Sequence, residues 1–225
     1  IEINNTGDLL ASNVVNKGGD IVLNAHSDLT VGYIEATDTV ALTVYGAIID
    51  DDTTDALDIL ATNLTLSAST GIGSSNALET KVSNLTATNT TLGNINIINT
   101  GNLNANSVIN SAKLSSGDNI NIITNFDLTV GIISARSGGD VTLIASGSII
   151  DGNDNATNII AKNRILSALT GIGSGDTLEI QVNNLDATNT SSGDINIINT
   201  GALNLIDLNS DGYSILNIGG AINIS

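Results

Sequence analysis

The heptapeptide Ile95-Asn96-Ile97-Ile98-Asn99-Thr100-Gly101 returns unchanged at residues 195–201. It belongs to a longer repeat, because residues 59–104 align without a gap on residues 159–204, and 30 of these 46 positions are identical. The chain is therefore built from a repeat of about 100 residues. Self-similarity at a fixed period is the sequence signature of solenoids and other repeat architectures.

A shorter period lies inside this repeat. Runs of alternating apolar residues begin at a mean step of roughly 20 residues. In one of them Val40, Leu42 and Val44 are separated by Ala41 and Thr43. Such alternation predicts a half-buried strand, and the Gly-Asp, Thr-Gly and Asn-Thr-Gly sequences between the runs favour turns. No stretch keeps a helical apolar period over three turns, so the sequence predicts an all-β structure.

These features together predict a right-handed parallel β-helix, or β-solenoid, with about eleven coils of ~20 residues. Each strand then bonds to the coil above and the coil below, and the inward apolar side chains stack into one core. Asn residues at matching turn positions are expected to form amide ladders. The side chains that we expect to point inward are Ile21, Leu23, Val40, Leu42, Ile95, Ile97, Val141, Leu143, Ile195 and Ile197.

We expect one continuous β-helix over residues 1–225, without a domain boundary. The copies of the large repeat cover residues 1–94 and 95–194, about five coils each, and a partial third copy covers residues 195–225. Both chain ends lie in strand-like sequence, so we interpret the chain as a segment of a longer repeat protein. Its ends are expected to contact flanking β-helix repeats of the same chain or, end to end, copies of itself.

The chain is strongly acidic, with 23 Asp and Glu against six Lys and Arg and a formal charge of -17. A surface of this sign repels phosphate, which argues against a nucleic-acid partner. No apolar run approaches the ~18 residues of a membrane-spanning helix, so we expect no membrane insertion. The absence of Cys excludes disulfides and Cys-ligated metals.

Two turns rich in carboxylate and amide oxygens are the best candidates for a metal site. Their members are Asp50, Asp51, Asp52 and Asp55 in the first turn, and Asp151, Asn153, Asp154 and Asn155 in the second. Oxygen ligands at alternate positions suit Ca²⁺, but the bidentate Glu and the fixed Gly of an EF-hand loop are missing. The alternative is a solvated polar turn. We therefore expect weak Ca²⁺ binding at most, no tightly bound metal and no other cofactor.

Catalysis is not expected, although a polysaccharide-active β-helix domain remains an alternative. Such an enzyme needs cations for a sugar acid and usually rings for stacking, whereas this surface charge repels uronic polymers. His26 lacks an evident Ser or Asp partner set. The cations and rings do not cluster in sequence; they are Lys17, Lys81, Lys113, Arg136, Lys162 and Arg164, and Tyr33, Tyr45, Phe126 and Tyr213.

The repeats resemble the β-helical shaft of filamentous-haemagglutinin-like proteins, which are large surface adhesins of Gram-negative bacteria usually exported by two-partner secretion. The resemblance covers nearly the whole chain. It rests on Gly18-Gly19-Asp20-Ile21-Val22-Leu23, Gly138-Gly139-Asp140-Val141-Thr142-Leu143, Gly193-Asp194-Ile195-Asn196-Ile197, Ala145-Ser146-Gly147-Ser148-Ile149-Ile150 and Thr170-Gly171-Ile172-Gly173. It implies no catalytic residue.

The resemblance implies the structural shaft of a secreted or cell-surface bacterial adhesin, or of an extracellular matrix fibre, with a role in cell adhesion or biofilm formation. The resemblance does not identify the host or matrix ligand. A self-assembling extracellular filament subunit is the second alternative, alongside the polysaccharide-active domain.

Overall fold

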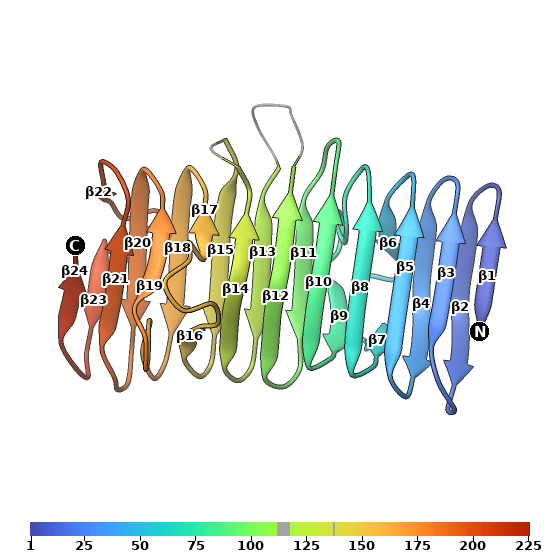
Figure 1. Ribbon diagram of the computed structural model, residues 1–225, viewed down its shortest axis with the longest axis horizontal. Coiled ribbons are helices and arrows are strands. Elements are labelled where there is room, and N and C mark those ends of the chain that lie inside the picture. The colour runs from blue at the N-terminus through green and yellow to red at the C-terminus, as the bar shows by residue number, and fades with distance from the viewer. Residues whose placement is uncertain (112–117, 137) are drawn as a thin grey trace.

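The computed structural model describes residues 1–111, 118–136 and 138–225, so Lys113 lies outside the described residues. Over these ranges the fold is all-β, without a helix, and its strands stack in parallel as a β-solenoid. Within each turn the chain passes from one to the other of two sheets of 12 strands each, which face one another along the whole length (Figure 1). The predicted fold class is confirmed.

Most consecutive strands along the chain alternate between the two sheets. Sheet A comprises β1 (Glu2–Asn5), β3 (Ile21–Ala25), β5 (Thr39–Val44), β8 (Asn63–Ala68), β10 (Asn84–Asn89), β12 (Leu103–Asn110), β14 (Leu128–Ser134), β16 (Ile149–Asp151), β17 (Ile159–Ile160), β19 (Leu178–Gln181), β21 (Ile195–Asn199) and β24 (Ile222–Ile224). Sheet B comprises β2 (Leu9–Asn16), β4 (Leu29–Ala36), β6 (Ile48–Asp50), β7 (Ile59–Leu60), β9 (Leu78–Lys81), β11 (Ile95–Asn99), β13 (Ile120–Thr124), β15 (Asp140–Ala145), β18 (Asn163–Ala168), β20 (Asn184–Asn189), β22 (Asn204–Leu205) and β23 (Ile215–Asn217).

The solenoid has about 9 turns, ~21 residues apart, rather than the eleven coils expected from the sequence. Insertions account for part of the difference. Register partners are 19 residues apart where Ile21 pairs with Val40, but 24 apart where Thr39 pairs with Asn63. The extra residues lie in the connection between β6 and β7, which leaves the ladder and returns to it.

The core forms because the alternation along each strand sends every second side chain inward. In β3 and β11 the apolar residues at alternate positions are buried, and those between them are half-buried. All ten side chains predicted to point inward are at most 1% exposed. They belong to one continuous cluster of buried apolar residues that extends from Ala11 to Ile197, so this prediction is confirmed.

One core position breaks the apolar pattern. Arg164 is 0% exposed, and its Nε, Nη1 and Nη2 atoms have no hydrogen-bond partner among the residues that the structure describes. Its register partners are Val141 and Leu185, both buried. Burial lowers the pKa of the Arg164 guanidinium well below its usual range, because apolar surroundings penalise the charged form.

Buried Asn side chains support the turns, as the expected amide ladders require. Asn89 is 0% exposed; its Oδ1 accepts the Gly71 N–H at 2.9 Å, and its Nδ2 donates to the Gly93 carbonyl at 2.9 Å. Gly93 has a φ of 92°, and an added Cβ would lie 2.5 Å from the Thr70 carbonyl oxygen. Only glycine fits this position without strain.

Outward Asn side chains form the predicted ladders between coils. Asn104 donates to Asn84 at 3.3 Å, and Asn84 donates to Asn63 at 2.9 Å. The second copy of the repeat builds the same ladder, in which Asn204 donates to Asn184 at 3.1 Å and Asn184 to Asn163 at 2.6 Å. The central amides of the two ladders, those of Asn84 and Asn184, therefore both donate and accept along the solenoid axis.

Equivalent strands of the two copies of the large repeat lie in opposite sheets of the solenoid. Strand β8 is in sheet A, whereas its counterpart β18, 100 residues later, is in sheet B. From β8 the chain passes β10, β12, β14 and β17 of sheet A and then enters β18, which makes four and a half turns. The expected five coils per copy are thus replaced by a half-integral number.

Candidate functional site: a buried carboxylate cluster

The predicted acidic turn follows β6 on sheet B. Asp50 ends this strand with its side chain buried, Asp52 is half-buried, and Asp51 and Asp55 are exposed. Carboxylate oxygens of Asp50, Asp51 and Asp52 lie within 4.8 Å of one another. The turn is held by its own hydrogen bonds, because the Asp52 N–H donates to Asp50 Oδ1 at 3.1 Å. Asp55 is not part of this group.

A second group of carboxylates meets Asp50 from the neighbouring coil. One carboxylate oxygen each from Asp50, Asp58 and Glu79 lie within 4.8 Å of one another, and all three residues are buried. Asp58 closes the connection 51–58 just before β7, and Glu79 lies on β9. The two strands fix this pair, because the Asp58 N–H donates to the Glu79 carbonyl and the Glu79 N–H donates to Asp58 Oδ2, both at 2.9 Å. We call these three residues the carboxylate cluster.

Burial and mutual repulsion raise the proton affinity of the carboxylate cluster. Burial, with the charges of Asp50 and Glu79 adding to it, raises the pKa of Asp58 to about 8. Burial and the charges of Asp50 and Asp55 raise the pKa of Glu79 to about 7. The cluster therefore favours a positive charge, in the form of bound protons or another cation, over three bare carboxylates.

The second copy of the repeat has an amide in place of one carboxylate, although Glu179 Oε2 is buried there without a hydrogen-bond partner among the described residues. Asn158 stands where the first copy has Asp58, and its backbone N–H and side-chain Oδ1 pair with Glu179 at 2.8 Å in the same way. Its Nδ2 donates to Asp151 Oδ1 and, at 3.0 Å, to Asn153 Oδ1. Asp151 in the second copy thus accepts a hydrogen bond from the Asn158 amide. At the equivalent place in the first copy, Asp50 lies next to the carboxylate of Asp58. Asp154 and Asn155 are exposed and take no part.

Sequence reasoning found Asp50 and missed Asp58 and Glu79. It grouped carboxylates by their nearness along the chain, whereas the cluster joins residues from neighbouring coils. The spacing of 21 residues between Asp58 and Glu79 was the available signal, because it equals the mean step between coils. The substitution of Asn158 for Asp58 at an offset of 100 was a second signal.

A further polar loop was also missed. Residues 206–214 leave sheet B between β22 and β23 and cover the outer face of β20, where Asp186 is 0% exposed. Asp186 Oδ2 accepts the N–H groups of Leu208 and Asn209 at 2.8 and 3.2 Å. Asp207 accepts three further backbone N–H groups of the loop. The bonds to Asp186 hold the loop on the solenoid, and those to Asp207 fix its internal conformation.

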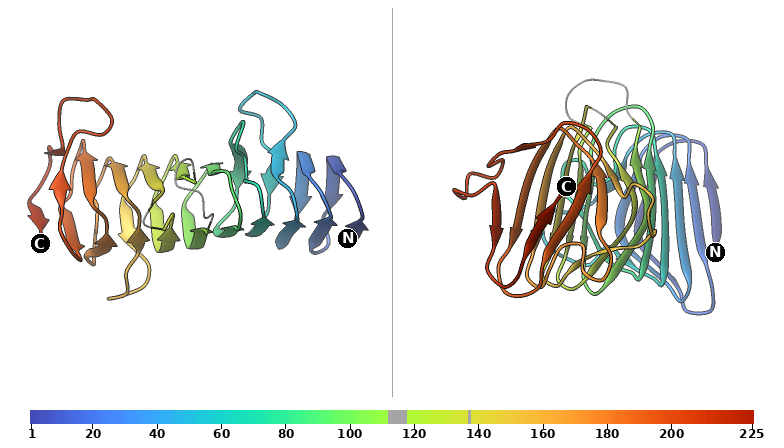
Figure 2. Two further views of the ribbon diagram at one scale, coloured as in Figure 1. Left: turned by 90° about the horizontal axis from the view of Figure 1, so that it is seen from above. Right: turned by 60° about the vertical axis from the view of Figure 1, so that its left-hand side comes forward.

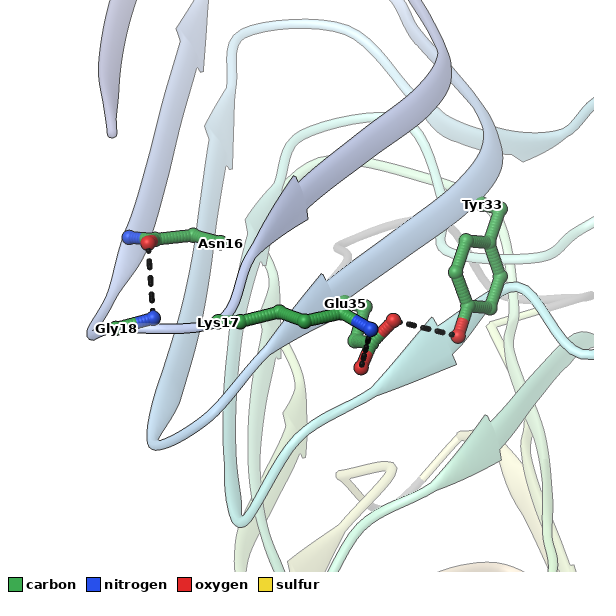
Figure 3. Close-up of polar contacts among 5 residues, drawn as sticks. All are labelled: Asn16, Lys17, Gly18, Tyr33 and Glu35. Atoms are coloured by element: carbon green, nitrogen blue, oxygen red, sulfur yellow. Dashed lines mark hydrogen bonds and ion pairs between the residues drawn. The ribbon is translucent and has the colours of Figure 1, made fainter.

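One cation and one aromatic ring contact the same carboxylate near the N-terminal end. Lys17 pairs with Glu35 at 4.0 Å, and the Tyr33 hydroxyl donates to Glu35 at 3.3 Å (Figure 3). This is the one ion pair among the described ranges. His26 lies against Tyr45, with ring centroids 5.0 Å apart. Phe126 and Tyr213 are exposed on other coils.

The fold defines the class of protein: a two-sheet parallel β-solenoid, built from a large repeat of four and a half turns. No family model, curated protein or solved structure matches the chain. None of the described segments forms a helix with the length and hydropathy of a membrane-spanning helix.

The carboxylate cluster predicts a pH dependence of stability in the presence of a chelator. The folded pKa values of Asp58 and Glu79, about 8 and about 7, lie above the ordinary values of 3.8 and 4.5. Their contribution to stability is therefore fully present below pH 4 and is lost as the pH rises toward 8. Asp58→Asn removes one of the two groups, so its stability relative to the wild type should increase over this window.

Denaturant unfolding at a series of pH values measures this difference. Asp154→Asn is the matched control, because it removes the same charge from an exposed position in the counterpart connection of the second copy. Its stability relative to the wild type should stay constant from pH 5 to 8, within about 0.5 kcal/mol. A constant difference for Asp58→Asn as well would show that the buried carboxylate does not retain its proton.

Proposed function

We propose that the chain is a structural shaft of a secreted or cell-surface bacterial adhesin or matrix fibre, which holds a binding tip away from the cell in adhesion or biofilm formation. The observation that carries this proposal is the continuous core, which runs through the stacked turns from Ala11 to Ile197. Parallel strands bond every turn to the next, so the rod transmits load along one axis. An acidic surface keeps such a rod soluble outside the cell.

A self-assembling filament is the second candidate, and the two end strands favour it. Within the described part of the chain, β1 pairs only with β3 and β24 only with β21, so each of these two end strands of sheet A has one free edge. Ile3 and Ile222 are exposed at these ends, although their register partners Leu23 and Ile195 are fully buried. A free edge with apolar side chains is a template for another strand. The two candidates share the axial contact and differ in whether a tip is attached.

The free ends predict association along the solenoid axis. The wild-type chain should form rods of constant width and increasing length as its concentration rises, as seen by sedimentation velocity and electron microscopy. A double substitution, Ile3→Lys with Ile222→Lys, should shorten these rods to single chains, because charged side chains on an edge oppose strand addition.

Ile132→Lys is the control for this experiment. Ile132 is 44% exposed on β14, in the interior of sheet A, so the substitution adds a charge away from the ends. The rods should keep their length in this variant. Lateral clusters of irregular width, or single chains at every concentration of the wild type, would contradict axial assembly.

A further inference from the structure

Three carboxylates lie close together in a buried position, and not all of them receive a hydrogen bond that would offset the cost of burial. Asp58 is 2% exposed, and Asp50 and Glu79 are 6% exposed. Asp50 accepts from the Asn76 side chain, and Asp58 accepts the Glu79 N–H. Within the part of the chain that the structure describes, Lys17–Glu35 is the ion pair present, so no Lys or Arg there neutralises the cluster.

The side chain of Glu79 provides the evidence for a ligand. Its Oε2 is buried and has no hydrogen-bond partner among the described residues. One of its carboxylate oxygens lies within 4.8 Å of oxygens from both Asp50 and Asp58, so the side chain is directed into the cluster. Oxygens bound to one Ca²⁺ at 2.3–2.6 Å can lie at most about 5 Å apart, and the observed separations fit within that limit.

We propose that Asp50, Asp58 and Glu79 form a Ca²⁺ site. Carboxylates that bind in mono- or bidentate fashion are the preferred ligands of this ion, which takes six to eight oxygens in flexible geometry. Mg²⁺ usually keeps several waters and one or two carboxylates, which suits a buried set of three less well. Zn²⁺ favours Cys and His, and neither belongs to the cluster.

The site differs from the expectation drawn from sequence, and it goes beyond the proposed shaft function. Its ligands come from β6, from the end of the connection 51–58 and from β9, so the bound ion joins neighbouring coils rather than one turn. The counterpart turn in the second copy should stay free of Ca²⁺, because the Asn158 amide already donates to Asp151 there. The connection between β6 and β7 and its counterpart project on opposite sides of the shaft (Figure 2).

The two copies supply a reciprocal experiment. Asp58→Asn installs the second copy's amide in the first copy, and Asn158→Asp installs the first copy's carboxylate in the second. Equilibrium dialysis with Ca²⁺ at constant ionic strength should show one ion fewer per chain for Asp58→Asn and one ion more for Asn158→Asp. Glu79→Gln should also lose one ion, and Asp55→Asn should keep the wild-type number.

Thermal unfolding gives an independent measurement. At a hundredfold excess over the dissociation constant, Ca²⁺ should raise the wild-type midpoint by roughly 5–10 °C, and this rise should shrink in Asp58→Asn. The Asp58→Asn midpoint in chelator should not fall below that of the wild type, which establishes that the variant folds. An unchanged number of bound ions in both Asp58→Asn and Glu79→Gln would overturn the proposal, and equal binding of Mg²⁺ would overturn the choice of Ca²⁺.

Discussion

Replacing Arg164 with leucine should raise the free energy of unfolding by about 3 kcal/mol, because a buried cation without a partner costs several kcal/mol. The first copy of the repeat shows the expected product. Leu64, the counterpart of Arg164, is 1% exposed and stacks between Val40 and Leu85. Arg164→Leu recreates this Val–Leu–Leu stack between Val141 and Leu185.

Two further variants test the cause of this gain. Lys162→Thr removes a positive charge from an exposed neighbouring position and restores the residue of the first copy, Thr62, so it should change stability by less than about 0.5 kcal/mol. Leu64→Arg should destabilise the first copy strongly, because it buries a cation there. Denaturant unfolding measures all three. A loss of stability in Arg164→Leu would mean that the guanidinium has partners in solution.

Ile122→Ala should cost about 4 kcal/mol of stability, whereas Ile123→Ala, at the next residue of β13, should cost less than about 1 kcal/mol. Ile122 is 0% exposed in the core, and Ile123 is 37% exposed on the outer face of the same strand. The two substitutions remove the same atoms from the same strand, so intrinsic strand propensity is the same in both. The difference between the two losses of stability therefore measures the effect of burial alone.

Chemical denaturation of both variants under one set of conditions provides the comparison. Similar losses at the two positions would indicate that β13 is shifted by one residue, since such a shift moves every side chain to the other face. The buried and exposed positions on β21, Ile197 and Ile198, repeat the experiment in the next copy of the repeat.

The alternation within strands could be read from sequence because it depends on neighbouring residues alone. The alternation predicts one inward face formed by Val40, Leu42 and Val44, and all three are buried. The turn count depends on something else, namely how many residues each connection adds before the chain rejoins the ladder. The connection between β6 and β7 adds an insertion whose length no local pattern encodes, so the predicted number of coils was too high.

The carboxylate cluster was hidden for the same reason. The contact between Asp50, Asp58 and Glu79 can be predicted only when the register between coils is known. The insertion before Asp58 shifts that register. Arg164 was visible in principle, because the alignment at an offset of 100 places it on Leu64. Its burial could not be predicted from its neighbours in sequence, because Asn163 and Ile165 do not indicate which coils pack against it.

The half-integral number of turns per copy relates the two copies by a two-fold screw operation along the rod. Four and a half coils at about 4.8 Å each correspond to a translation of roughly 22 Å together with a half rotation. The outward Asn ladders of the two copies accordingly face opposite directions, one on sheet A and one on sheet B. Any bend that one copy favours is opposed by the next, and the Asn ladder that one flank of the rod presents recurs on the other flank.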